Sequence, residues 1–291
     1  MVAAGSIRVN SAGAVAGIDS RQAAGLAGHA ARALALRPLF APLAALLDAL
    51  PIDACAELDG LNSLLAAIDP RPRTREGRPI RFVRPDASPL RYEERVRASG
   101  EVVTRPANWH DFFNALVWMR FSRTKAELNA LHLDEMRSER SGTGRGPLRD
   151  AATQFDESGI VVLASDPSLF ELLEQRRWHE LFWTRRTEVV SSLRFLVFGH
   201  GLYDALRAPF YRICGRAALI AAAPTIIAAD VATQCRHADT VLAARFAART
   251  CYPRPKSLLA LPLLGIPGVC PQNERAEYYA DTVQFRPPPS G

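Results

Sequence analysis

Three histidines in this chain stand near carboxylate or amide residues, and the first of them is His110. The run Asn108-Trp109-His110-Asp111 is followed by Asn114. Asn108 is a good helix N-cap with Asp111 three residues later, and on the helix that follows, His110 and Asn114 share a face. These residues either cap the helix and satisfy neighbouring groups, or they bind a ligand or take part in catalysis.

The second histidine, His132, belongs to a polar stripe with Lys125 and Asn129. Spacings of four and three residues place the three side chains on one face of a predicted helix. Such a stripe is either a solvated face or one wall of a site.

Five charged residues lie between His132 and His200 in the sequence. They are Arg145, Arg149, Asp150, Asp156 and Glu157. Asp156 and Glu157 precede Ser158-Gly159, which is typical of a turn. Asp150 could hold a divalent metal through oxygen or orient a histidine. The guanidinium groups of Arg145 and Arg149 suit a phosphate.

The third histidine, His200, follows Phe198-Gly199 in what we expect to be an apolar helix. Glycine weakens a helix there but permits another backbone to approach closely. His200 and Asp204 would lie one turn apart, so the carboxylate could orient the imidazole. The alternative is a histidine that is simply hydrogen-bonded in the core.

Together these residues could form a mononuclear metal site or an acid/base pair, if the fold brings them together. We predict a metal-assisted hydrolase that uses one divalent metal and acts on a small anionic, phosphoester-like substrate. The predicted catalytic residues are His110, Asp111, His200 and Asp150. The predicted metal ligands are His110, Asp111 and Asp150, and the predicted substrate-binding residues are Asn114, Arg145 and Arg149.

Two other classes of function stay open. In a structural or interaction protein the same polar residues would be caps, turns and buried hydrogen bonds. A nucleic-acid-binding protein would use its arginines, since the chain has a net charge of +6 and all but two of its 36 basic residues are arginines. The arginines are scattered along the sequence, which disfavours a nucleic-acid partner.

Cysteine usage and hydropathy predict a cytoplasmic location. The five cysteines are widely spaced and odd in number, with no metal-finger spacing, so we expect free thiols in a reducing compartment. The longest apolar stretch, residues 217–229, is too short to span a bilayer and Pro224 interrupts it. We therefore expect no membrane partner.

The pattern of the remaining sequence predicts an α+β fold that is mainly α. We expect residues 1–35 to form a poorly ordered Ala/Gly-rich extension, and residues 36–291 to form a single helical domain with a Pro-rich C-terminal wrap. Residues 79–84 alternate like a strand, and a small antiparallel sheet is predicted from two hairpins, over 91–104 and 153–164. The main helices are expected over 36–50, 55–68, 108–121, 122–137, 178–207 and 230–250.

Several stretches resemble a bacterial family known as domain of unknown function 3025. They are RYEERV and GEVVTRPANWHDFFNALVWMRFSRTKAELNALH within 91–132, then RGPLRDAATQFDESG, FGHGLYDAL, LGIPGVCPQNE and YYADTVQFRP. The resemblance covers residues 36–289 in the same order. It implies no reaction, because the family has no assigned activity. It implies that motif positions are occupied by His110, Asp111, Asn114, Arg145, Asp150, Asp156, Glu157, His200, Asn273 and Glu274.

Overall fold

The computed structural model describes residues 31–50, 58–138 and 146–287. Most of the predicted N-terminal extension, and Arg145, lie outside these residues. The helices are α2 (Ala44–Ala49), α3 (Leu58–Ala66), α4 (Tyr92–Ser99), α5 (Trp109–Arg120), α6 (Ser122–Ser138), α7 (Pro147–Ser158), α8 (Ser168–Glu174), α9 (Arg186–Ser192), α10 (His200–Leu206), α11 (Pro224–Ile227) and α12 (Val231–Ala248). The strands are β1 (Arg81–Val83), β2 (Glu101–Val103), β3 (Gly159–Ala164), β4 (Leu193–Val197), β5 (Cys214–Ala221) and β6 (Leu259–Pro262).

The described residues therefore form a mainly helical α+β structure, but its sheets differ from the prediction. A four-stranded mixed sheet has the order β4-β3-β5-β6, with β3 antiparallel to β4 and parallel to β5. A separate pair, β1 and β2, is parallel. Neither sheet is made of the two predicted hairpins.

The predicted hairpin over 153–164 is wrong because a helix leads directly into a strand there. Pro147 occupies the first turn of α7, a position that proline favours, and α7 continues through Ser158. Gly159 then begins β3, in which every residue is buried. A strand buried on both faces is apolar throughout, as Ile160 and the residues after it are.

The predicted hairpin over 91–104 is also wrong. Residues 92–99 form α4, and the side chain of Glu94 accepts a hydrogen bond from the backbone N–H of Arg91 at its start. Gly100 ends the helix in the left-handed conformation (φ 74°) and lies against the carbonyl of Pro79, where no Cβ would fit. The strand expected over 79–84 is confirmed as β1.

The long helix predicted over 178–207 is interrupted. A short π-helical turn (Glu180–Thr184) and α9 precede β4, and α10 begins only at His200. The reason is the apolar run of β4, which pairs with β3. By contrast, Asn108 caps α5 as predicted, and its side chain accepts a hydrogen bond from the backbone N–H three residues later. Asp230, at which the helix over 230–250 was expected to begin, caps α12 in the same way.

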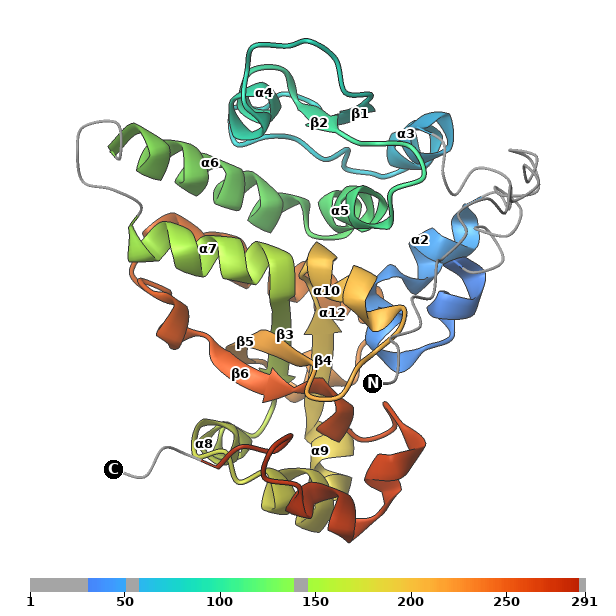
Figure 1. Ribbon diagram of the computed structural model, residues 1–291, viewed down its shortest axis with the longest axis vertical. Helices are drawn as coiled ribbons and strands as arrows, with labels where there is room; N and C mark the ends of the chain where they lie inside the picture. The colour runs from blue at the N-terminus through green and yellow to red at the C-terminus, as the bar shows by residue number, and fades with distance from the viewer. Residues whose placement is uncertain (1–30, 51–57, 139–145, 288–291) are drawn as a thin grey trace, which may run out of the picture.

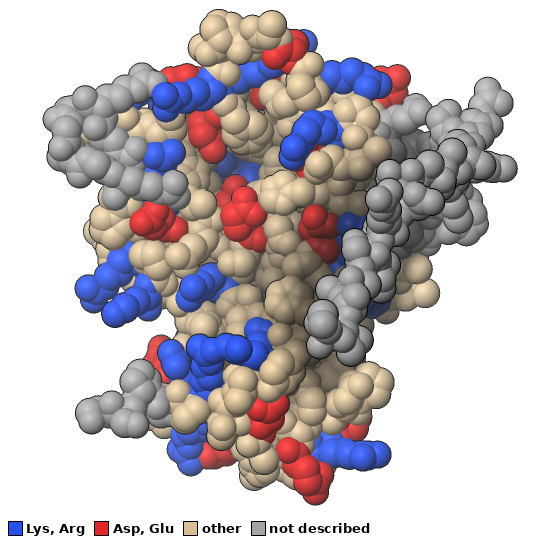
Figure 2. Space-filling view, viewed as in Figure 1, with Lys and Arg blue, Asp and Glu red and all other residues tan. Residues whose placement is uncertain are grey.

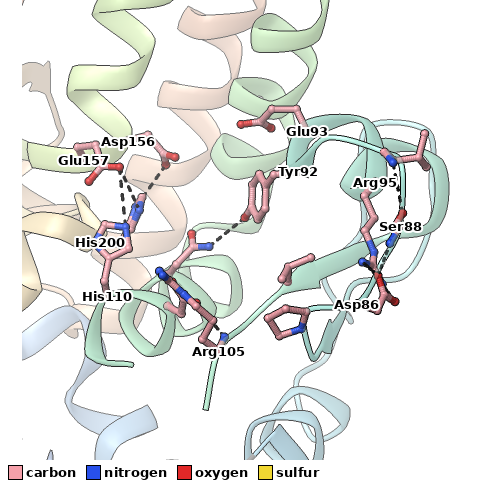
Figure 3. A pocket seen from close by; sticks show the side chains of 15 residues that line it. Asp86, Ser88, Tyr92, Glu93, Arg95, Arg105, His110, Asp156, Glu157 and His200 are labelled. Carbon is pink, nitrogen blue, oxygen red and sulfur yellow. Dashed lines mark hydrogen bonds and ion pairs between the residues drawn. The ribbon is translucent and has the colours of Figure 1, made fainter. Parts of the chain in front are cut away.

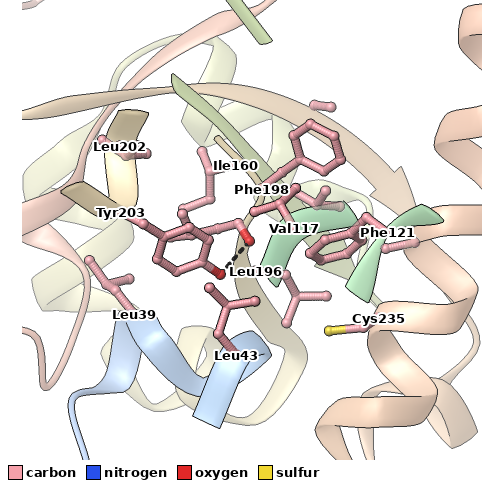
Figure 4. Packing of buried hydrophobic residues seen from close by; sticks show 14 of the residues in the cluster. Leu39, Leu43, Val117, Phe121, Ile160, Leu196, Phe198, Leu202, Tyr203 and Cys235 are labelled. Carbon is pink, nitrogen blue, oxygen red and sulfur yellow. Dashed lines mark hydrogen bonds between the residues drawn. The ribbon is translucent and has the colours of Figure 1, made fainter. Parts of the chain in front are cut away.

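The core lies between the four-stranded sheet and the helices above it in Figure 1, where α7, α5 and α10 lie between the sheet and the β1/β2 pair. Figure 4 shows Leu39 and Leu43 of the N-terminal 3₁₀ helix (Pro38–Leu43) packing near Tyr203. The Tyr203 hydroxyl donates to the Val197 carbonyl over 2.7 Å, which satisfies its one polar group inside this core. Within the described ranges no helix is long and apolar enough to cross a membrane.

Candidate functional site

Three helix ends meet at one pocket of about 560 Å³. The first is the start of α5, which carries His110. The side-chain oxygen of Asn108 accepts a hydrogen bond from the backbone N–H of Asp111 over 3.0 Å and so fixes this first turn. Capping leaves the half-exposed His110 side chain available to face the pocket.

The second helix end is the C-terminus of α7, which carries Asp156 and Glu157. Phe155 is fully buried and stacks on Phe198, and this packing fixes the last turn of the helix. The next two side chains then line the pocket. Figure 3 shows both carboxylates directed toward the histidines.

The third helix end is the start of α10, where two glycines flank His200. A Cβ on Gly199 would lie 2.5 Å from the carbonyl oxygen of Glu157, and one on Gly201 would lie 2.5 Å from its carboxylate. The backbone N–H of Gly199 donates to the carbonyl of Gly159 over 2.8 Å. The two glycines therefore allow α10 to approach the end of α7 and bring His200 to Glu157.

The resulting cluster holds two imidazoles and one carboxylate. His200 Nε2 lies 3.5 Å from Glu157 Oε1, and His110 Nε2 lies 3.9 Å from the same oxygen. The two imidazole rings are edge to face with centroids 4.5 Å apart. One ligand atom from each of the three residues lies within 4.8 Å of the others.

A buried ion pair lies next to His200 of this cluster. Lys125 on α6, only 4% exposed, donates from Nζ to Asp156 Oδ1 over 2.6 Å. Burial would raise the pKa of Asp156, but the Lys125 ammonium and the nearby imidazoles outweigh burial and hold this pKa below its usual value. His200 Nδ1 is buried, makes no hydrogen bond to the described residues, and lies 3.9 Å from the same Asp156 oxygen.

Burial shifts the pKa values of two cluster residues, His200 and Glu157. It lowers the pKa of His200 to about 4, so the imidazole is neutral at pH 7 and has a free lone pair. Burial also raises the pKa of Glu157. A neutral imidazole is the form that binds a metal or accepts a proton.

A second polar group lies beside the cluster, on α4. Asn129 on α6 donates to the backbone carbonyl of Glu93 over 3.1 Å and also to its carboxylate. Burial raises the pKa of Glu93 to about 7. Next to it, the Tyr92 hydroxyl accepts a hydrogen bond from Asn114 over 2.9 Å. Glu93 is therefore a carboxyl that can give or take a proton near neutral pH.

The arginines that line the pocket are held by carboxylates. Arg95 donates to Asp86 through both terminal nitrogens (2.6 and 2.8 Å) and through Nε to Glu101 (2.6 Å). Arg105 donates to both oxygens of Asp111 over 2.8 and 2.9 Å. Burial alone would raise the pKa of Asp111, but Arg105 outweighs it and lowers this pKa.

The structure brings together only some of the predicted site residues. His110, His200, Asp111 and Asn114 line the pocket, but the Asp111 carboxylate is bound by Arg105 and is not in the three-residue cluster. Asp150 and Arg149 do not line the pocket, since they lie in the first turn of α7, about 10 Å along the helix axis from Glu157.

Other predicted partners are arranged differently from expectation. The carboxylate of Asp204 accepts from Arg207 over 2.7 Å, whereas the carboxylates facing His200 are Asp156 and Glu157. His132 is buried on α6 and does not line the pocket. The motif residue Asn273 is buried elsewhere and donates to the carbonyls of Leu264 and Ile266.

Sequence reasoning missed Glu157 and Glu93 as site residues. It assigned Glu157 to a turn because Ser158-Gly159 follows, and it placed Glu93 in a strand. The signal that could have found Glu157 was the proline at the start of α7, followed by buried Ala151, Ala152 and Phe155 at helical spacing. That pattern extends the helix to Ser158.

The donor set fits a divalent metal. Zinc bound at about 2.0–2.2 Å by nitrogen and oxygen in a tetrahedral site requires ligand atoms about 3.3 Å apart. The two histidine–glutamate separations, 3.5 and 3.9 Å, exceed this value by about 0.2 and 0.6 Å. All three ligand atoms lie within 4.8 Å of one another, so side-chain rotations that also bring the two imidazoles closer together would allow His110, Glu157 and His200 to bind one ion.

Comparison with known proteins gives a family but no activity. No curated protein and no solved structure matches the chain. Residues 80–288 match the family model described as "Protein of unknown function (DUF3025)", and they include all three helix ends of the pocket. Because this match spans well over half of the 291 residues, the chain belongs to that family.

Proposed function

We propose that the chain is a metal-assisted hydrolase whose active centre is formed by His110, Glu157 and His200. The observation that carries this proposal is the meeting of two imidazoles and a carboxylate, from three different helices, at one wall of a pocket of about 560 Å³. Two histidines and one glutamate are a ligand set of catalytic zinc sites, which keep a further position for water or substrate.

The charges around the pocket support an anionic, phosphoester-like substrate. Asp86, Asp111 and Asp156 are each paired with a basic side chain, namely Arg95, Arg105 and Lys125. Glu93 is partly protonated at pH 7 because burial raises its pKa to about 7. A divalent cation next to Glu157 would therefore leave excess positive charge in the pocket, which attracts an anion.

Three residues of the pocket would have distinct roles in the proposed reaction, namely His200, Asp156 and Glu93. A bound divalent metal supplies Lewis-acid activation of the substrate and lowers the pKa of a water molecule. The neutral imidazole of His200 offers Nε2 as a ligand. Asp156, held by Lys125, lies 3.9 Å from its Nδ1, and a closer approach would give the hydrogen bond that orients a metal-bound imidazole. Glu93 can deliver a proton to the leaving-group oxygen, since its carboxyl is partly protonated at neutral pH.

The experiment is an activity assay on protein purified without a histidine tag. The chain, stripped with a chelator and reloaded with Zn²⁺ or Mn²⁺, is offered bis(p-nitrophenyl) phosphate, p-nitrophenyl phosphate and p-nitrophenyl acetate. We expect metal-dependent hydrolysis of a phosphoester that falls by at least about 100-fold in Glu157→Gln. The matched control is Glu174→Gln on the exposed surface of α8, which should leave the rate unchanged.

Two results would contradict the proposal. One is activity that survives Glu157→Gln, because the cluster then has no part in it. The other is that none of the three substrates is hydrolysed with either metal. The second result would favour the non-catalytic alternative, in which the same polar residues serve as caps and buried hydrogen bonds.

A further inference from the structure

A second cavity, of about 420 Å³, lies over the exposed face of β5 and β6. Four arginines line it, and no aspartate or glutamate does. They come from three separate segments of the chain, with Arg212 just before β5, Arg216 near its start, and the other two at Arg176 and Arg286. Figure 2 shows basic side chains gathered over this part of the sheet, with acidic side chains only at the margin.

The strand register positions two walls of this cavity. Along β5 the side chains alternate, so Cys214 and Arg216 share a face, and they pair with Pro262 and Ala260 of β6. Gly215 between them points to the other face, where a Cβ would meet Ile160. Arg216 therefore projects from the rigid sheet into the cavity.

The other two walls are loop segments held by hydrogen bonds. The Trp178 indole donates to the carbonyl of Arg286 over 2.9 Å and fixes the C-terminal segment against the residues that follow α8. Arg176 and Arg212 both have positive φ, 53° and 70°, which is uncommon for arginine. The fold thus places two of these arginines at the cavity despite an unfavourable backbone conformation.

These four guanidinium groups are not neutralised within the described chain. None of them forms an ion pair with a described carboxylate, whereas arginines such as Arg95, Arg105 and Arg249 do. Asp281 interacts electrostatically with Arg212 without forming an ion pair with it, and its carboxylate accepts a hydrogen bond from the Tyr211 hydroxyl. A cavity with several unpaired positive charges is complementary to an anion.

We propose that this cavity is a binding site for a small polyanion that carries phosphate groups. Guanidinium forks bind phosphate through paired hydrogen bonds, and four of them around about 420 Å³ suit a compact ligand rather than a long polymer. The site is separate from the histidine cluster because the two cavities share no lining residue. They lie at the same α7–β3 junction, where Glu157 lines one cavity and Ser158 lines the other.

The test is a titration with inorganic pyrophosphate in the presence of a chelator, which keeps metal out of the histidine cluster. We expect saturable 1:1 binding by calorimetry and an increase in Tm. Arg216→Gln should weaken binding by about 10- to 100-fold, since it removes a charge-assisted hydrogen bond to phosphate. Arg254→Gln, which removes the same charge from another exposed position, should change the affinity by less than about 2-fold.

Stability without ligand provides an internal check. Because Arg216→Gln reduces the repulsion among like charges, the variant should have a Tm equal to or above that of the parent. If Arg216→Gln fails to fold, Arg286→Gln on the exposed C-terminal segment replaces it, with the same expected loss of affinity.

Three results would overturn the proposal. The first is no binding of pyrophosphate. The second is equal weakening by Arg216→Gln and Arg254→Gln, which would mean that only the net charge matters. The third is preferential binding of citrate or of a single-stranded oligonucleotide, which would assign the cavity to carboxylates or to nucleic acid instead.

Discussion

Replacement of Glu93 by glutamine tests the electrostatics of the pocket without disturbing its shape. The glutamine side chain has the same size, and its carbonyl can still accept a hydrogen bond from Asn129. The substitution removes only the ability to ionise. Because burial raises the pKa of Glu93 to about 7, the parent protein must accommodate a poorly solvated carboxylate once the pH exceeds that value.

The sign and size of the effect follow from linkage. The folded-state pKa of Glu93, about 7, lies above its unfolded value of about 4.5. The unfolded state therefore loses the proton first, and the free energy of unfolding falls as the pH rises from about 4.5 to about 7. A difference of about 2.5 pKa units corresponds to about 3 kcal/mol, which Glu93→Gln should recover at pH 8 but not at pH 4.5.

Chemical denaturation of the metal-free protein at several pH values measures this directly. The difference in free energy of unfolding between Glu93→Gln and the parent should grow in favour of the variant between pH 4.5 and pH 8. Glu174→Gln, on the exposed surface of α8, should show the same dependence of the free energy of unfolding on pH as the parent. The reasoning would be refuted if the free energy of unfolding of Glu93→Gln changed with pH as that of the parent does, or if this variant were less stable than the parent at pH 8.

Two further predictions concern the support of the cluster. Lys125→Met leaves the Asp156 carboxylate buried without its cation, so we expect a loss of about 3–5 kcal/mol in the free energy of unfolding, partly recovered by adding Asp156→Asn. Equal stability of the single and double variants would contradict this pairing. Gly199→Ala would place a Cβ 2.5 Å from the Glu157 carbonyl, so we expect thermal denaturation to show a loss of about 1–3 kcal/mol. An unchanged Tm would mean that α10 and α7 do not need this close approach.

The sequence predicted those parts of the fold that depend on local signals. The cap at Asn108 is confirmed, and it was predictable because an N-cap side chain bonds to a backbone group only three residues away. The start of α12 near residue 230 is confirmed as well. The sheet was not predictable in the same way. One of its two central strands, β3, pairs with residues 193–197 and 216–221, and such distant pairing leaves no mark on the local pattern of either strand.

For the site, the sequence indicated the histidines but not their carboxylate partner. His110 and His200 meet as the hypothesis required. Glu157 was missed because Ser158-Gly159 marks the change from helix to strand, which resembles a turn when only local residue types are considered. Asp150 is on the same helix but two turns too early to reach the histidines.

The arginines show the same limit of local reasoning. They are scattered along the sequence, which disfavoured a basic surface, yet Arg176, Arg212, Arg216 and Arg286 line one cavity. They lie in three segments of the chain, and the hydrogen bond from Trp178 to the Arg286 carbonyl is one of the contacts that bring these segments together. The spacing of the arginines in the sequence therefore does not predict that these four line one cavity.

The most direct test of the central claim is the number of divalent ions bound per chain. Equilibrium dialysis of the untagged protein against Zn²⁺, with metal measured by mass spectrometry, should give one ion per chain for the parent. Glu157→Gln and His200→Ala should each reduce the affinity by at least about 100-fold, while Asp150→Asn, outside the cluster, should bind like the parent. A parent that binds no ion, or cluster variants that still bind one with parental affinity, would contradict a metal site at His110, Glu157 and His200.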